Sequence, residues 1–335
     1  MNERTTEPRE EIASFHPSEA VFLAKRSSSQ LSTGQEIGIL SCGDRITPGN
    51  YSFHSRFRRA INFFDDTNLV AIVDASIRSG PFNIVVANIE SFAANSIFID
   101  RASFLLNNIY FDIQTVPQYD SKLTIPKSID ITKLHLNLLY FKQIIINHAS
   151  TKSLVFLLKE RKDQKAQKHK NDTAGSFRYH GRPSKPVIPK SFEWILQDRF
   201  TAGTKLIEQG KILDGVELLR GLGNGLTPSG DDFIAGFLIA LHLQQLLYGK
   251  NHTTLINDIF RIAQNNNLLS TAFLRSAKEG RVCEKLKHTI SALLTAKPHE
   301  LLSPTLELLS IGATSGADIA VGLIFGLERI RLYAS

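Results

Sequence analysis

The sequence changes its pattern part-way along, and this change restricts the chain to a fold with two unlike halves. Before about residue 130, short β-rich runs alternate with turn signals. After a basic tract at 159–190, almost every segment has apolar residues at helical spacing. We therefore predict an α+β fold, with an N-terminal β-rich, barrel-like or sandwich-like domain followed by a C-terminal helical bundle domain.

Three regions follow from this pattern. We predict a β-rich domain at 15–128, a helical connection with a basic, flexible insert at 129–190, and a helical domain at 191–335. The clearest predicted strands lie in the runs 36–44, 68–76, 82–90 and 109–116. Helical spacing begins near Ile131, and the helices expected after the tract are 191–208, 211–220, 231–248, 253–264, 268–279, 282–295, 303–310 and 317–332.

The net charge of +7 raises the possibility of nucleic-acid binding, but its location argues against it. Residues 159–190 hold ten Lys and Arg against three acidic residues, so the rest of the chain sums to zero. A single basic tract rich in Gly, Pro, Ser and Asn is typical of a solvated linker rather than of a basic binding face. Phe177 and Tyr179 are too few aromatic residues for a base-stacking platform.

We find no pattern typical of a targeting segment, a membrane span or a cysteine-based site in the sequence. The N-terminus is charged and has no apolar core, and the most apolar run, 233–248, is interrupted by His and Gln, so it indicates a buried helix. Cys42 and Cys283 stand alone, which excludes a thiolate zinc site and a disulfide framework. We expect a cytoplasmic protein that binds neither nucleic acid nor a membrane.

The most unusual local feature is a cluster of glycines. Residues 210–236 contain seven of the 21 glycines of the chain, and at the centre of the cluster lies the segment GLGNGLTPSGDD at 221–232. Glycines allow positive φ and close backbone approach, and the loop leads into a helix N-terminus, which favours an anion. The loop has no lysine, as a Walker P-loop requires, and no preceding strand, as a dinucleotide-binding fingerprint requires.

The end of the glycine loop is repeated near the C-terminus. Residues 229–236 and 315–322 both read S-G-x-D-x-x-x-G, and an apolar helix follows each. Ser at the N-cap with an acid three residues later is a capping box, and capping alone accounts for Ser315 and Asp318. Capping accounts less well for the first loop, because one cap does not require four glycines before it.

Two kinds of ligand fit these residues. A small molecule with an anionic end and a carbamoyl or amide NH2 group would place its anion on the main-chain amides and its NH2 group on a carboxylate. The alternative is Mg²⁺ held by Asp231, Asp232 and Asp318. The spacing leaves both open. We predict that these three carboxylates are catalytic and that the ligand is bound by Gly223, Asn224, Gly225, Thr227, Ser229, Gly230, Ser315 and Gly316.

Outside the loops, the predicted chemistry is sparse. His54 and Ser55 are disfavoured as a base and nucleophile, because adjacent strand residues point to opposite faces. His54 and Arg56 are two residues apart on an expected strand, so we expect both side chains on one face, in contact with a substrate carboxylate. Arg275 is expected to supply positive charge to a phosphate.

The same segments resemble a known family. The stretches GLGNGLTPSGDDFIAGFLIAL, NNLLSTAFLRSAKEG and IGATSGADIAVGLIFGL, together with SFHSRFRRAINF and SGPFNIVV nearer the N-terminus, resemble the family catalogued as domain of unknown function 2877 and labelled as carboxylases. That family includes the AllH-type subunit of oxamate carbamoyltransferase. The basic tract resembles an insertion relative to shorter members.

The resemblance implies carbamoyl transfer in the breakdown of allantoin and other purine products. Oxalurate and phosphate would be exchanged for oxamate and carbamoyl phosphate, with companion subunits as partners. Two alternatives stay open at this stage. One is a non-catalytic interaction subunit of a multi-subunit complex, and the other is a Mg-dependent small-molecule enzyme.

Overall fold

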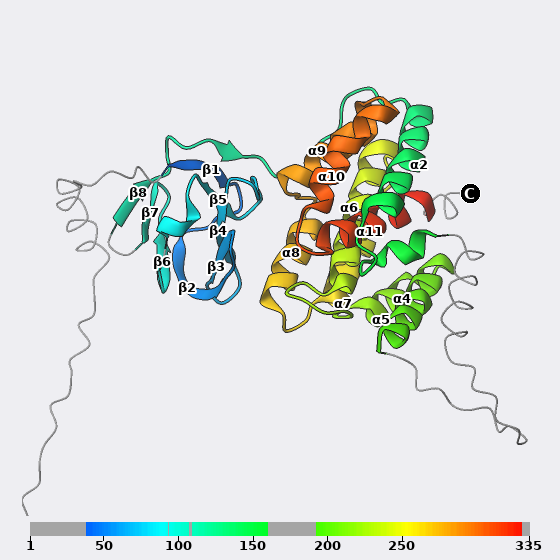
Figure 1. Cartoon of the computed structure of the whole chain (residues 1–335), viewed down its shortest axis with the longest axis horizontal. Helices are drawn as coiled ribbons and strands as arrows, with labels where there is room; N and C mark the ends of the chain where they lie inside the picture. The colour runs from blue at the N-terminus through cyan, green and yellow to red at the C-terminus, as the bar shows by residue number, and fades with distance from the viewer. Residues whose placement is uncertain (1–37, 93, 107–108, 160–191, 330–335) are drawn as a thin grey trace, which may run out of the picture.

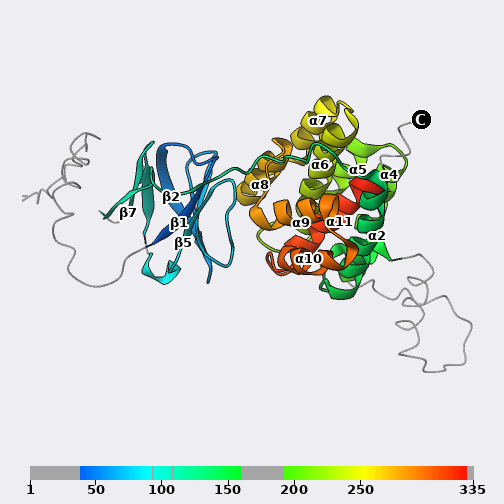
Figure 2. The same cartoon turned by 90° about the horizontal axis from the view of Figure 1, so that it is seen from above.

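The chain folds into two lobes of different structure, one of strands and one of helices (Figures 1 and 2). The computed structural model describes residues 38–92, 94–106, 109–159 and 192–329. The predicted α+β fold is confirmed. Nearly all of the basic tract, on which we predicted a flexible linker, lies outside the described residues.

In the described residues, the N-terminal lobe is one curved sheet of nine strands, half of a barrel, with the order β8-β7-β6-β2-β3-β4-β5-β1-β9. Its strands are β1 (Ile39–Gly43), β2 (Gly49–Arg56), β3 (Ala60–Phe64), β4 (Leu69–Asp74), β5 (Asn83–Val86), β6 (Ser96–Ile99), β7 (Ser103–Leu106), β8 (Ile109–Asp112) and β9 (Gln118–Tyr119). One face encloses an apolar core that includes Tyr51, Phe63 and Phe104. Each of the four predicted runs contains a strand.

The C-terminal lobe is built around the nearly completely buried helix α6 (Ser229–Tyr248). The other helices are α2 (Ile131–His148), α4 (Phe192–Glu208), α5 (Ile212–Leu219), α7 (Thr253–Ala263), α8 (Leu268–Lys278), α9 (Glu284–Thr295), α10 (Leu302–Leu309) and α11 (Ser315–Arg329), with short 3₁₀ turns at Ile89–Ser91, Leu154–Leu158 and Pro298–Leu301. The eight helices expected after the tract are confirmed, with ends within two residues wherever the end is described. No helix in the described part of the chain is both long and apolar enough to span a membrane.

The segment before the basic tract also belongs to the helical core. Leu134 and Phe141 of α2, and Leu154 of the following 3₁₀ turn, are buried in one cluster with Phe233 of α6. The described part of the expected connection therefore packs as an integral part of the helical lobe.

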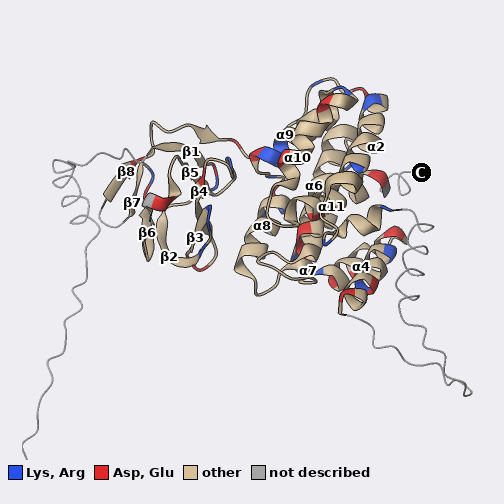
Figure 3. Cartoon of the chain, viewed as in Figure 1, with Lys and Arg blue, Asp and Glu red and all other residues tan. Residues whose placement is uncertain are grey.

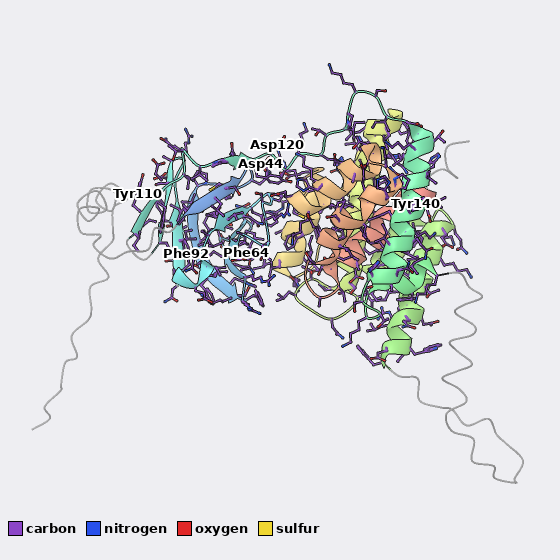
Figure 4. All side chains as sticks on the ribbon, turned by 45° about the horizontal axis from the view of Figure 1, so that its top comes forward. Asp44, Phe64, Phe92, Tyr110, Asp120 and Tyr140 are labelled. Atoms are coloured by element: carbon purple, nitrogen blue, oxygen red, sulfur yellow. The ribbon has the colours of Figure 1, made fainter. Side chains whose placement is uncertain are left out.

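Apolar residues join the two lobes at their facing surfaces. Phe64 and Phe82 from the sheet pack in one buried cluster with Leu269 and Ala272 of α8. The ring of Phe82 also meets that of Phe273, with centroids 5.2 Å apart. In Figure 4, Phe64 lies on the side of the sheet that faces the helices, whereas Tyr110 lies on the far side.

Backbone and charge pairs complete this junction. The loop after α8 exchanges main-chain hydrogen bonds with the segment after β9, from Leu123 N to Gly280 O (2.8 Å) and from Val282 N to Ser121 O (2.9 Å). Arg281 forms an ion pair with Asp44, and Asp44 and Asp120 both lie toward the helical lobe (Figure 4). Figure 3 shows basic and acidic residues interspersed over the described parts of both lobes.

Two glycines set the closest packing in the helical lobe. A Cβ on Gly236 of α6 would lie 2.0 Å from the carbonyl oxygen of Ile319, and one on Gly322 of α11 would lie 2.0 Å from that of Phe233. The backbones of α6 and α11 can approach this closely only because neither position has a side chain. The two contacts are equivalent. Gly236 and Gly322 occupy the same position in the two S-G-x-D-x-x-x-G repeats, and their contact residues, Ile319 and Phe233, also occupy the same position as each other.

We predict that Gly322→Ala lowers the free energy of unfolding by about 1–3 kcal/mol or more, because the added methyl group forces the two helices apart. Chemical denaturation measures the change. Gly49→Ala is the control, since its Cβ would make only ordinary contacts, the nearest at 3.5 Å. Equal stability of the two variants would contradict this account of the helix contact.

Candidate functional site

The two repeats form matching helix starts. In the first, Gly230 N donates to Leu222 O (2.8 Å), and in the second, Gly316 N donates to Ile311 O (3.0 Å). A Cβ on Gly230 would lie 1.8 Å from Leu219 O, and one on Gly316 would lie 1.9 Å from Leu308 O. Both glycines are therefore required for packing against the preceding short helix, α5 or α10. The contacts indicate an approximate two-fold relation between α5–α6 and α10–α11.

Ser229 does not act as the predicted N-cap of a capping box. The N-cap of α6 is Pro228, and no side chain in the described part of the chain caps this helix. The serine of each repeat instead faces the other repeat, because the Ser315 hydroxyl acts on Asp232 and the Ser229 hydroxyl acts on Asp318. Thr227 Oγ1 and Ser315 Oγ, 3.1 Å apart, link the two loops directly. The crossed arrangement follows from the close approach of α6 and α11, which no local pattern encodes.

Asp232 is the carboxylate at the centre of this arrangement. Its side chain is buried, with 6% exposed, and Thr227 Oγ1 donates to its Oδ2 (3.0 Å). Burial raises the pKa of Asp232 to about 7, with a further contribution from the negative charges of Asp318 and Asp231, while hydroxyl groups of Ser315 and Thr227 oppose the rise. The group can therefore exchange a proton near neutral pH.

Asp318 is the matching carboxylate of the second repeat, and it is fully buried. Leu154 N donates to its Oδ1 (2.7 Å). Burial raises the pKa of Asp318 to about 6, and the hydroxyl groups of Ser229 and Thr314 lie near enough to lower it. Neither makes a hydrogen bond of normal geometry to Oδ2, which has no partner among the described residues. Asp318 thus holds the 3₁₀ turn at Leu154 against α11.

Asp231 has a different environment from its neighbour. Gly221 N donates to its Oδ1 (2.6 Å), and Asn265 Nδ2 (2.8 Å) and Ser270 Oγ donate to its Oδ2. Both oxygens are thus occupied in fixing the glycine loop to α8. The magnesium site predicted as an alternative does not form, because Asp231 turns away from Asp232 and Asp318. Within the described ranges, no group of three or more His, Cys, Asp and Glu side chains is arranged to hold a metal ion.

The glycine loop contains main-chain amides that have no hydrogen-bond acceptor among the described residues. Gly223, Asn224, Gly225, Leu226 and Thr227 donate no main-chain hydrogen bond within the described part of the chain, and neither do Gly312, Ala313 and Thr314 in the second loop. Gly223 (φ 114°), Gly225 (φ 117°) and Gly312 (φ 59°) have the left-handed backbone that these turns need. Such amides suit an anionic group.

Both loops open onto one cavity of about 490 Å³ between the two lobes. Of the predicted ligand-binding residues, Asn224, Gly225, Thr227 and Ser315 line the cavity, and of the predicted catalytic carboxylates, Asp232 does. Gly223 and Ser229 are not among the lining residues, and they pack closely together, since a Cβ on Gly223 would lie only 2.9 Å from Ser229 N. The loop is therefore neither sealed inside the protein nor fully hydrogen-bonded.

Sequence reasoning missed the residues that other elements bring to the cavity. The sheet contributes Phe57, Ala60, Asn62 and Pro81, and α8 with its following loop contributes Phe273, Ser276 and Arg281. No spacing in the sequence links these residues to the glycine loop, because the docking of the lobes brings them together. Cys283 also lines the cavity, and burial raises the pKa of its thiol, which disfavours the reactive thiolate.

Three predicted contacts differ in the structure because of local geometry. A register shift in β2 between Phe53 and Ser55 breaks the strand's alternation, so His54 and Arg56 do not share a face. Arg56 donates to Phe92 O within the sheet lobe. His54 Nδ1 lies 3.0 Å from Ser55 Oγ, so the argument that their side chains point to opposite faces was wrong. Arg275 donates to Thr67 O (2.9 Å) across the junction and is not among the residues that line the cavity.

Comparison with known proteins supports the significance of the two helix starts. Residues 219–327 match the family model described as oxamate carbamoyltransferase subunit AllH. This region of the chain is therefore similar to the AllH family. It runs from the end of α5 into α11, so it contains both loops and the carboxylates of Asp232 and Asp318, while the sheet lobe lies outside it. No solved structure matches the chain.

We predict that Asp231→Asn lowers the free energy of unfolding by about 1–3 kcal/mol, because an amide cannot accept from all three donors that the carboxylate satisfies. Chemical denaturation measures the loss. Asp214→Asn, at an exposed position on α5, is the matched control and should be neutral. An Asp231→Asn variant as stable as the control would contradict the structural role of this carboxylate.

Asp232→Asn should behave differently and show a dependence on pH. The pKa of Asp232 is raised from 3.8 in the unfolded chain to about 7 in the folded protein, so the folded state binds more protons and loses stability as the pH rises through this range. Asparagine does not titrate. The stability of Asp232→Asn relative to wild type should therefore increase between pH 4 and 7 and then level off, as measured by denaturation at a series of pH values. A difference that is independent of pH would contradict the raised pKa.

Proposed function

We propose that this protein is a subunit of an oxamate carbamoyltransferase of allantoin catabolism and that its interlobe cavity binds a small carbamoyl- or phosphate-bearing ligand. One observation carries the proposal. The unpaired amides of two helix starts and a carboxylate that titrates near neutral pH line the same cavity, inside the region matched by the AllH family model.

The first part of the argument concerns the anion. Amides of Asn224, Gly225 and Thr227 from one loop, and of Ala313 and Thr314 from the other, are free to donate to a phosphate or carboxylate in the cavity. The dipoles of α6 and α11 favour negative charge at the same place. The negative charges of Asp232 and Asp318 would oppose the binding of an anion. Because their pKa values are raised, both carboxylates can take up a proton when an anion binds, and this removes the repulsion.

The second part concerns the NH2 group. An ionised Asp232 accepts a hydrogen bond from a carbamoyl or amide NH2, and a protonated one donates to a carbonyl oxygen. In carbamoyl transfer from carbamoyl phosphate to oxamate, the amide nitrogen of oxamate forms a bond to the carbamoyl carbon, phosphate leaves, and the nitrogen gives up a proton. A carboxylate with a pKa near 7 is suited to take that proton.

Companion subunits are part of this proposal. The family is described as a subunit of the transferase, so catalysis would require partner chains, with ligand binding retained by this chain alone. The same cavity argues against the alternative of a purely interacting subunit, because such a subunit has no need of a lined cavity with unpaired amides.

We expect carbamoyl phosphate, phosphate or oxamate to raise the melting temperature of the wild-type protein, since a ligand that binds the folded state stabilises it. Asp232→Asn should retain a melting temperature at least equal to wild type in the absence of ligand at pH 7.5, and should lose most of the shift with carbamoyl phosphate. Asp214→Asn should retain the full shift. If none of the three compounds binds the wild type in calorimetry, or if Asp232→Asn binds carbamoyl phosphate as tightly as wild type, the proposal fails.

A further inference from the structure

A second group of side chains able to take part in chemistry lies on the sheet, and one of its members, Asn62, lines the same cavity. His54 Nδ1 is 3.0 Å from Ser55 Oγ, and Asn62 Nδ2 donates to the same Ser55 Oγ (3.1 Å). Asn62 lines the cavity, whereas neither the glycine loop nor the AllH match includes any of the three residues. This group is separate from the carboxylates of the helix starts.

The bulge in β2 explains how adjacent residues come to meet. Phe53 is opposite Phe63 and Ser55 is opposite Asn62, so His54 is the extra residue of the strand. A bulge redirects side chains that regular alternation would place on opposite faces. The His54 ring packs on that of Phe64, with centroids 5.0 Å apart, and Phe64 belongs to the apolar cluster of the junction. His54 and Ser55 are thus both directed to the face that the helical lobe covers.

The hydrogen bonds are compatible with proton transfer from Ser55 to His54. The Asn62 amide nitrogen can only donate, so Ser55 Oγ accepts from it and still has its own proton, which it can donate to His54 Nδ1 when that nitrogen carries no proton. Asn62 is buried, with 6% exposed, which fixes its amide, while Ser55 is part-exposed and His54 is exposed. A serine hydroxyl aimed at an imidazole and held by a third group is the arrangement of an activated nucleophile.

We propose that Ser55 is a nucleophile toward an activated carbonyl compound, with His54 as its general base and Asn62 as its positioning residue. Ser55 Oγ forms a bond to the carbonyl carbon, His54 Nδ1 takes the hydroxyl proton, and the bond to the leaving group breaks with its electron pair. The identity of the substrate rests on the proposed function. If the compound is carbamoyl phosphate, the leaving group is phosphate and Ser55 becomes O-carbamoylated.

The first experiment does not depend on the proposed function. The full chain is treated with a fluorophosphonate, which phosphonylates activated serines and releases fluoride, and the modified peptide is identified by mass spectrometry. We expect the label on Ser55 in wild type and in Ser52→Ala, whose exposed serine lies on the same strand. Ser55→Ala should lose this label. His54→Phe keeps a ring on Phe64 but has no base, so the rate of labelling should fall by about 100-fold or more.

Wild type without label on Ser55, or equal rates for wild type and His54→Phe, would overturn the proposal. Circular dichroism of each variant shows whether it is folded. A His54→Phe protein that fails to fold is replaced by His54→Gln, for which the same loss of rate is expected.

The second experiment separates this proposal from the proposed function. The full chain is incubated with carbamoyl phosphate, and both binding and a carbamoyl group on the Ser55 peptide are measured. Cyanate released from the reagent modifies lysines, so carbamoylation of lysine in Ser55→Ala gives the background. Binding without an adduct on Ser55 would overturn carbamoyl transfer to this serine and leave the proposed function standing. Absence of binding would defeat the proposed function, whereas the fluorophosphonate result would still decide whether Ser55 is activated.

Discussion

The close contact between α6 and α11 is the constraint on which the rest of the structure depends. At Gly236 and Gly322, the backbone of each helix packs against a carbonyl oxygen of the other helix. A side chain at either position would prevent this approach. This contact aligns the N-termini of both helices, so that the Ser315 hydroxyl lies near Asp232 and the Ser229 hydroxyl lies near Asp318. It also buries both carboxyl groups, which is the main reason why their pKa values rise. The contact between α6 and α11 thus accounts both for the packing of the two helices and for the raised pKa values of the two carboxyl groups.

The cavity requires a second condition, the docking of the sheet on the helices. Apolar contacts among Phe64, Phe82 and Leu269, and the main-chain hydrogen bonds between the loop after α8 and the segment after β9, hold the sheet over the two loops. The helical lobe supplies amides and a titratable carboxylate, and the sheet supplies Asn62 with its attached serine and histidine. On our two proposals, the reactive groups therefore come from both lobes, with Asp232 and Asn62 lining the cavity and Ser55 bonded to Asn62. Such a division agrees with the family match, which covers the wall of α6 and α11 and leaves the sheet outside.

Much of the fold could be predicted from local patterns, because those patterns act over short distances. The helix at 253–263 and its neighbours follow from apolar spacing, and the strands at 69–74 and 83–86 follow from β-branched runs between turn signals. Local rules failed where tertiary contacts override them. The serines of the repeats have good capping chemistry, yet they face the neighbouring helix start instead. The alternation rule placed His54 and Ser55 on opposite faces, but a bulge, whose register depends on the partner strand, brings them together.

The sequence by itself determined which residues have unusual backbone freedom and which carry charge. It therefore indicated the glycine loop, Asp232 and the second repeat at 315–322 as candidate site residues, since glycine content and an S-G-x-D spacing are properties of the chain alone. The tertiary structure decided what each carboxylate does. Asp231 and Asp232 are adjacent in sequence and identical in chemistry, but one is held by three donors on its own side of the helix, while the other is buried against Ser315 at the cavity wall. Successive helical residues point about 100° apart, so only the surroundings on each side could distinguish them.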